Sequence, residues 1–129
     1  MSVDETKFDP VFKEKLDAFR KDLADNDIPT YLVSGWRSAE EQHAEFLKNN
    51  SKCDGYVKLS KHQSGKAADV TFMLPSGYPW WPNENTSDGA TRWLSFATIA
   101  EKHGLTSGAR FEPLKQWGCG WDPNHVEIA

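Results

Sequence analysis

Residues 60–73 read SKHQSGKAADVTFM, and this stretch decides the fold that the sequence predicts. Its second part, Lys66 to Met73, is a strand candidate, in which successive side chains point to opposite faces. Val70 and Phe72 fall on one face, and Asp69 falls on the other. We therefore expect a strand that buries an apolar face and presents a carboxylate on the opposite side.

A second alternating stretch lies at the end of the chain. The strand predicted from His125 to Ile128 places two apolar side chains on one face and His125 and Glu127 on the other. If the two strands are neighbours in one sheet, His125 and Asp69 lie on the same side. With His62 they form a set of two imidazoles and one carboxylate, which suits Zn²⁺ and leaves a fourth position for water.

The spacing of these residues alone leaves other interpretations open. An isolated histidine is more often a surface or hydrogen-bonded residue than a metal ligand, and Asp69 could cap a turn. Cys119 with His125 is a further candidate pair of ligands, but the sequence has no CxxC pair to support it. We expect His43 and His103 to be structural, the latter near a helix C-terminus where the helix dipole favours imidazolium.

Helices and a short strand are expected before this region. Asp9 and Pro10 are typical of an N-cap and a first helical residue, and apolar residues at helical spacing continue the helix for about four turns. Residues 31–33 then predict a short strand. Ser38 and Glu41 fit a capping box at the start of a second helix.

The region after residue 73 predicts a loop followed by a third helix. Leu74 to Gly89 is rich in Pro, Asn and Ser and contains Trp80 and Trp81, so we expect a long surface loop that could wall a cleft. Thr91 to His103 has apolar residues at helical spacing, and Gly104 is a good residue to end the helix.

Length and composition fit one globular domain. The chain has 129 residues, of which 38% are hydrophobic and 12% aromatic, enough to bury a core. The net charge of −4, with no run of basic residues, makes nucleic acid an unfavourable partner.

The chain ends and the cysteines bear on the cellular compartment. Residues 1–8 contain no apolar segment, so the sequence predicts no secretory signal and synthesis in the cytoplasm. No apolar stretch is long enough to span a bilayer. Cys53 and Cys119 are far apart in sequence, which favours free thiols over a disulfide in a reducing compartment.

Three motifs occur in a fixed order along the chain. They are Ser34-Gly35-Trp36-Arg37-Ser38 followed by Gln42, then Ser-x-His-x-x-Gly-x-Ala-x-Asp from Ser60 to Asp69, and Asp-x-x-His-x-Glu from Asp122 to Glu127. Together they resemble the zinc D-Ala-D-Ala carboxypeptidase and L-alanyl-D-glutamate endopeptidase family, from about Tyr31 to the C-terminus. The resemblance implies an α+β fold of hedgehog/DD-peptidase type, a single zinc peptidase domain over residues 1–129. In that fold an antiparallel sheet carries helices on one face and the zinc cleft on the other.

The resemblance also implies roles for individual residues. One Zn²⁺ would be bound by His62, Asp69 and His125, and Asp122 would be the general base that takes a proton from water. Arg37 would face the substrate and stabilise an oxyanion or a substrate carboxylate, with an ion pair or a solvated cation as the alternative. Three further motif residues would support the ligands or face the substrate: Ser60, Gln42 and Glu127.

The implied activity is hydrolysis of peptidoglycan stem peptides. We expect a monomeric, endolysin-like L-alanyl-D-glutamate endopeptidase of phage or prophage context, which reaches the wall after release or export by another factor. The alternatives are a D-alanyl-D-alanine carboxypeptidase or dipeptidase, and a non-catalytic hedgehog-like module that keeps zinc. One departure from the family is a Trp-Gly pair at Trp117-Gly118, later than usual, so the resemblance leaves the cleft wall at residues 111–120 undefined.

Overall fold

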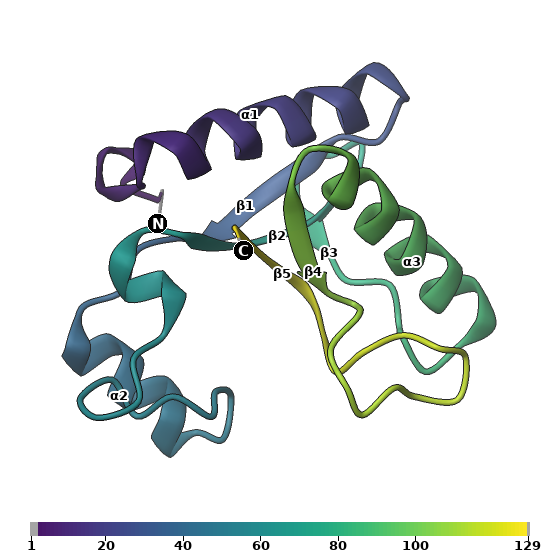
Figure 1. Cartoon of the computed structure of the whole chain (residues 1–129). Helices are drawn as coiled ribbons and strands as arrows, with labels where there is room; N and C mark the ends of the chain where they lie inside the picture. Colours follow the sequence, from purple (N-terminus) through teal and green to yellow (C-terminus); the bar gives the residue numbers. More distant parts are fainter. Residues whose placement is uncertain (1–2, 129) are drawn as a thin grey trace.

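The computed structural model describes residues 3–128 and has an α+β architecture (Figure 1). Three α-helices and a five-stranded sheet are formed within this range. The helices are α1 (Pro10–Asp25), α2 (Ala39–Leu47) and α3 (Ser87–Lys102). The strands are β1 (Thr30–Ser34), β2 (Ala67–Met73), β3 (Pro79–Trp80), β4 (Leu105–Gly108) and β5 (Asp122–Ile128), and two 3₁₀ turns are η1 (Glu5–Lys7) and η2 (Lys61–Ser64).

The sheet is antiparallel and places the strands that carry Asp69 and His125 next to each other. Its strand order is β1-β2-β5-β4, with β3 paired to β2. In the register of β2 and β5, Asp69 lies opposite His125. The expectation that these strands are neighbours, on which the convergence of the two side chains depended, is confirmed.

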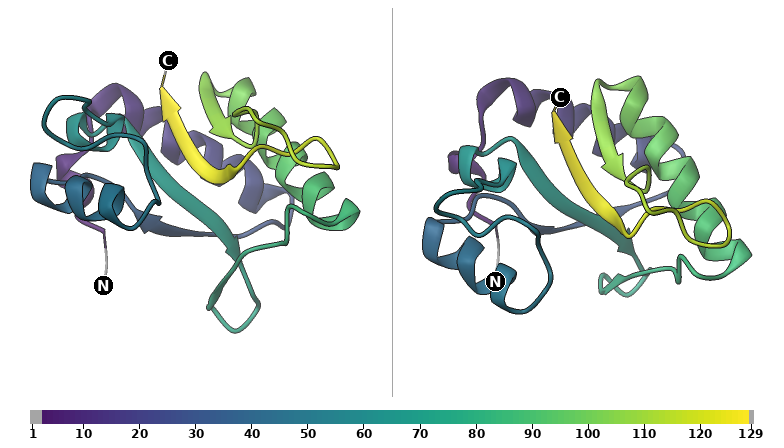
Figure 2. Two further views of the ribbon diagram at one scale, coloured as in Figure 1. Left: turned by 90° about the horizontal axis from the view of Figure 1, so that it is seen from below. Right: turned by 60° about the horizontal axis from the view of Figure 1, so that its bottom comes forward.

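Helices α1 and α3 cover one face of the sheet, and β2 and β5 run side by side in front of them in Figure 2. Aromatic contacts join these layers: Phe19 of α1 packs against Phe96 of α3 with ring centroids 5.0 Å apart, and Phe72 of β2 packs against Trp93 at 4.9 Å. The apolar residues of α1 recur at helical spacing, and the side of the helix that they form is buried, as predicted. Its fully buried residues are Phe12, Leu16, Phe19 and Leu23.

Helix α2 lies apart from this core, which refines the expectation that the helices share one face of the sheet (Figure 1). Gln42 is its one buried residue, and Ser38 with Glu41 forms the predicted capping box. Because α2 buries so little apolar surface in the core, it is available to flank the opposite face of the sheet.

Several parts of the secondary structure differ from the prediction. Helix α3 begins four residues earlier than expected, because the Thr86 hydroxyl accepts from the Gly89 amide and caps the helix. The predicted loop from Leu74 to Gly89 contains the short strand β3, held by pairing with β2. Strand β4 was not predicted, since four residues carry too little periodicity and it is formed by pairing with β5.

Candidate metal centre

His62 is positioned by a 3₁₀ turn that its own sequence encodes. The Ser60 hydroxyl accepts from the His62 amide at 3.2 Å, and the Gln63 side chain accepts from the Ser60 amide at 2.9 Å. Gly65 ends the turn in the left-handed region, with φ of 71°. The buried His62 ring donates from Nδ1 to the Gly35 carbonyl at 2.9 Å, so its Nε2 is left to face the sheet.

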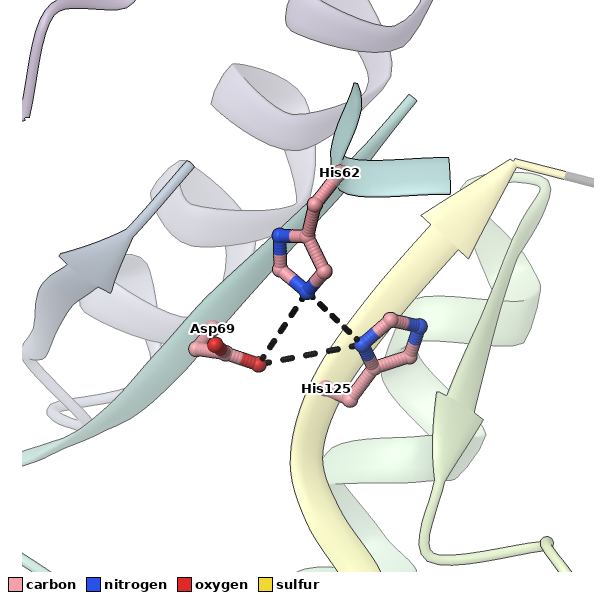
Figure 3. A group of neighbouring side chains, drawn as sticks. All are labelled: His62, Asp69 and His125. Atoms are coloured by element: carbon pink, nitrogen blue, oxygen red, sulfur yellow. Dashed lines mark hydrogen bonds and ion pairs between the residues drawn. The ribbon is translucent and has the colours of Figure 1, made fainter. Parts of the chain in front are cut away.

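Three ligand atoms converge in front of the sheet (Figure 3). His62 Nε2 lies 3.2 Å from His125 Nδ1, and the Asp69 Oδ1 atom lies 3.7 Å from each. Donor atoms of a tetrahedral zinc site with bonds of about 2.1 Å are separated by about 3.4 Å. The side chains of the predicted ligand set therefore stand close to the spacing that one metal ion requires.

The hydrogen bonds around His125 fix which nitrogen faces this point. Its Nε2 donates to the Glu127 carboxylate at 2.8 Å, which leaves Nδ1 to face His62. Since His62 Nδ1 is also committed, two nitrogen lone pairs and a carboxylate oxygen meet at one place. Such an arrangement is repulsive unless a cation, either a proton or a metal ion, lies between them. The donor set thus fits a bound metal.

The pKa values of the three groups agree with this picture. Burial lowers the pKa of His62 to about 4. Burial also acts against charge on His125, but the nearby Asp69 carboxylate and the hydrogen bond to Glu127 raise its pKa to about 9. Burial acts against charge on Asp69 as well, yet its contacts with His125 and His62 bring the pKa of this carboxyl down to about 2. Without a metal, the centre carries a proton on His125 at neutral pH.

The second oxygen of Asp69 is held by residues of the first motif. Asp69 Oδ2 accepts from Ser34 Oγ at 2.5 Å and from Arg37 Nη2 at 3.0 Å. Arg37 also donates from Nη1 to Gln42 Oε1 at 3.1 Å. The Gln42 amide then donates to the Cys53 carbonyl at 2.9 Å. Arg37 therefore forms an ion pair with Asp69, which was the alternative to a role in substrate binding. Its side chain also lines the cleft, so the two roles do not exclude each other.

Asp122 lies beside the three candidate ligands, at the start of β5. Its Oδ2 atom is 3.9 Å from His125 Nδ1. Burial raises the pKa of this carboxyl to about 6, and the nearby Asp69 carboxylate adds to the increase. A carboxyl group with a pKa in this range can both accept and return a proton near neutral pH.

A cleft of about 800 Å³ opens in front of these residues. Helix α2 contributes Glu41 and Glu45 to one wall, and Phe111 and Trp121 contribute to the other. Lys52 Nζ lies 5.3 Å from the Trp121 ring centroid, so loops from the two walls approach each other. The sequence did not indicate Phe111, Trp121 or Lys52 because they lie in irregular segments, although the position of Trp121 next to Asp122 could have indicated it. It did not indicate Glu41 or Glu45 because an acidic residue on an exposed helix face carries no sign that it borders a cleft.

Other predictions about single residues are settled by their contacts. Cys53 and Cys119 are free thiols, as expected. His43 contacts the Asp54 carbonyl and His103 contacts Asp22, each away from the metal centre, in agreement with structural roles. Trp80 and Trp81 do not line the main cleft; Trp81 lines a smaller hollow next to it. Among the described residues, no helix is long and apolar enough to cross a membrane.

The sequence and the structure of this chain are similar to those of known peptidases. No family model matches the sequence. The chain is 25% identical over 130 residues to the peptidoglycan L-alanyl-D-glutamate endopeptidase CwlK of Bacillus subtilis, over 92% of this chain and 72% of CwlK. The solved structure of the L-Ala D-Glu endopeptidase ChiX of Serratia marcescens matches with a TM-score of 0.68 and 19% identity, over 97% of this chain and 83% of ChiX.

The chain has the same fold as the endopeptidase ChiX. A second solved structure, the vancomycin resistance D,D-pentapeptidase VanY in complex with Zn(II), matches with a TM-score of 0.59 and 16% identity, over 94% of this chain and 72% of VanY. The resemblance that the three sequence motifs indicated is confirmed, and so is the α+β fold of DD-peptidase type.

Proposed function

We propose that this chain is a zinc-dependent peptidoglycan peptidase that hydrolyses the L-alanyl-D-glutamate bond of the stem peptide. The observation that carries the proposal is the convergence of His62, Asp69 and His125, with Asp122 beside them at the edge of a large cleft. CwlK and ChiX are both described as L-alanyl-D-glutamate endopeptidases, which supports the choice of this bond.

Zinc bound by these three residues would supply Lewis acidity, which polarises a peptide carbonyl and makes a water molecule acidic near pH 7. Asp122 would take a proton from the water that attacks the carbonyl of L-Ala, and would return a proton to the amine of D-Glu as the C–N bond breaks. Arg37, which lines the same cleft, would offer a fixed guanidinium to the developing oxyanion or to a substrate carboxylate.

Two other functions fit parts of the same observations. A D-alanyl-D-alanine carboxypeptidase is favoured by the match to VanYB, a structure in complex with D-Alanine-D-Alanine. A non-catalytic zinc module is disfavoured, since the described residues offer three ligands and structural zinc sites usually fill all four positions from protein. Digestion of muropeptides followed by mass spectrometry separates the three candidate functions. Release of a saccharide that still carries L-Ala supports the proposed endopeptidase, and release of terminal D-Ala supports the carboxypeptidase. Absence of any cleavage by zinc-loaded protein supports the non-catalytic module.

The sharpest test of the catalytic roles is Asp122→Asn, which keeps the shape of the side chain but removes the base. We expect zinc content of about one per chain to be retained while turnover falls by about 10² to 10⁴. Loss of zinc would make Asp122 a ligand, and normal turnover would transfer the role of base to another carboxylate, Glu127 first. In contrast, His62→Ala or His125→Ala should lower zinc content and activity together.

We further propose that residues 1–129 act as one monomeric zinc peptidase domain, of phage or prophage context, on wall peptides reached after release or export by another factor. Size-exclusion chromatography with light scattering tests the oligomeric state, and a mass of one chain is the expected result.

A further inference from the structure

A second hollow, of about 350 Å³, lies next to the catalytic cleft. The two cavities share Trp121, Asp122 and Asn124, so they meet at the proposed base. The far side of the hollow is formed by the segment from Trp81 to Glu84. The second hollow therefore adjoins the cleft at the residue proposed as the base.

The hollow is bordered by an exposed aromatic side chain, Trp81, on a backbone segment that hydrogen bonds hold. Trp81 is 50% exposed, and no aromatic or cation contact with a described residue engages its ring. Its neighbour Trp80, in contrast, packs on Phe72 with ring centroids 6.0 Å apart. The backbone is fixed on both sides of Trp81, because Thr71 Oγ1 donates to the Trp80 carbonyl at 2.7 Å and Trp93 Nε1 donates to the Pro82 carbonyl at 2.8 Å. The backbone that carries Trp81 is thus already ordered before a ligand binds, which removes that part of the entropic cost of binding.

Polar side chains complete the lining of the hollow. Asn83, Glu84 and Asn124 surround the space that Trp81 borders. Among described residues, Asn124 makes no side-chain hydrogen bond, and its amide can both donate and accept. A flat aromatic face beside amide and carboxylate groups suits a ligand with an apolar C–H face and a rim of hydroxyl and acetamido groups. A sugar ring has this chemistry.

We infer that this hollow binds the amino sugar to which the stem peptide is attached; the inference rests on the proposed function. In peptidoglycan, L-Ala is the first residue of the stem and is joined by an amide bond to the lactyl group of N-acetylmuramic acid. For a cut after L-Ala, the sugar begins one residue, about 3.5 Å, and one lactyl group from the scissile bond. A sugar site must then adjoin the base, as the hollow adjoins Asp122.

The test compares two substrates with zinc-loaded protein: a stem peptide N-acylated with plain lactic acid, and the same peptide attached to N-acetylmuramic acid. We expect the kcat/KM of the wild type to be about tenfold higher for the sugar-bearing substrate. Trp81→Ala should reduce this ratio to about one, and Trp81→Phe, which keeps a planar ring, should retain most of it. Trp117→Ala is the matched control, because Trp117 is 49% exposed but lines neither cavity, and it should keep the full ratio.

Equal kcat/KM for the two substrates in the wild type would overturn the inference, and so would a preference that survives in a folded Trp81→Ala protein. If the wild type cuts neither substrate, the proposed function itself fails, which is a different result from cutting both at the same rate. Thermal melting of each variant establishes that the compared proteins are folded.

Discussion

The two histidines of the centre present different nitrogens to the candidate metal position, because a hydrogen bond occupies Nδ1 of His62 but Nε2 of His125. A backbone carbonyl, that of Gly35, holds His62, whereas a carboxylate, that of Glu127, holds His125. Glu127 is in turn paired with Lys61 at 2.7 Å. A carboxylate behind a ligating histidine fixes the ring orientation and makes the ligand more basic.

Glu127→Ala tests this support directly. We expect zinc affinity to fall by about 10- to 100-fold, since His125 loses the partner that fixes its tautomer. Chelator competition measures the affinity, and Glu45→Ala is a suitable control, because Glu45 also lines the cleft but contacts Asn50 rather than a ligand. An unchanged affinity in Glu127→Ala would show that the ring is oriented without this carboxylate.

Arg37 has two roles to separate, the ion pair with Asp69 and the proposed contact with substrate. If the substrate role dominates, Arg37→Ala should lose about 10²-fold or more in turnover while zinc stays bound. Zinc content and kcat measured on the same preparation decide the matter. Loss of zinc would assign Arg37 to holding Asp69, and wild-type turnover would leave it only a structural ion pair.

The raised pKa of His125 predicts how zinc binding depends on pH. Because the group binds zinc only when neutral and its pKa without metal is about 9, uptake at neutral pH must release a proton. Deprotonation of His125 should therefore raise the affinity for zinc about tenfold per pH unit between about pH 6 and about pH 8. The affinity should level off above the pKa of His125. Calorimetry in buffers of different ionisation enthalpy counts the protons, and a count of zero would contradict the assignment.

At the scale of elements, the turn η2 couples the metal centre to the start of α1. The Asp9 amide donates to the Gly65 carbonyl at 3.0 Å, and Asp9 is also the N-cap of α1. A Cβ added at Gly65 would clash with the Lys7 carbonyl oxygen. The turn that carries His62 is therefore packed tightly against the chain that leads into the helix.

Gly65→Ala should destabilise the protein by more than about 1 kcal/mol, because it combines a positive φ with this clash. It should also weaken zinc binding, since His62 lies on the same turn. Gly77→Ala is the control for backbone strain alone, because Gly77 has a φ of 91° and nothing within 4 Å of an added Cβ. Denaturant unfolding compares the two variants, and equal losses would rule out a role for the close packing.

At the scale of the whole molecule, the metal would join segments that are distant in sequence. His62 comes from η2, Asp69 from β2 and His125 from β5. A metal ion that binds the folded state and not the unfolded chain stabilises the fold by mass action. The centre is thus expected to contribute to stability as well as to catalysis.

Removing zinc with a chelator should lower the melting temperature. At free zinc a thousandfold above its dissociation constant, the stabilisation is about 4 kcal/mol, which corresponds to roughly 10 °C or more for a chain of this size. The variant His125→Ala, treated in the same way, should show almost no shift. An equal shift in this variant would place the stabilising metal elsewhere.

Several features of the protein were determined by the sequence alone. Asp9 with Pro10 and the apolar spacing after them set the start and the buried side of α1, and Ser38 with Glu41 set the start of α2. The alternation around Asp69 correctly placed Val70 and Phe72 in the core, but Thr71, on the Asp69 face, is fully buried as well, so alternation alone did not tell a buried side of β2 from an exposed one. Each of these signals acts between residues a few positions apart, where propensity, capping and periodicity operate.

Only the tertiary structure decided the features that depend on distant partners. Strands β3 and β4 are too short to show periodicity, and they exist because β2 and β5 offer them backbone hydrogen bonds. The ion pair of Arg37 with Asp69 and the exposure of Trp81 beside Asp122 likewise follow from how distant segments pack. Local patterns specify which face a side chain occupies, but the register between strands more than fifty residues apart is set by the packing of the whole core, and that register brings Asp69 opposite His125.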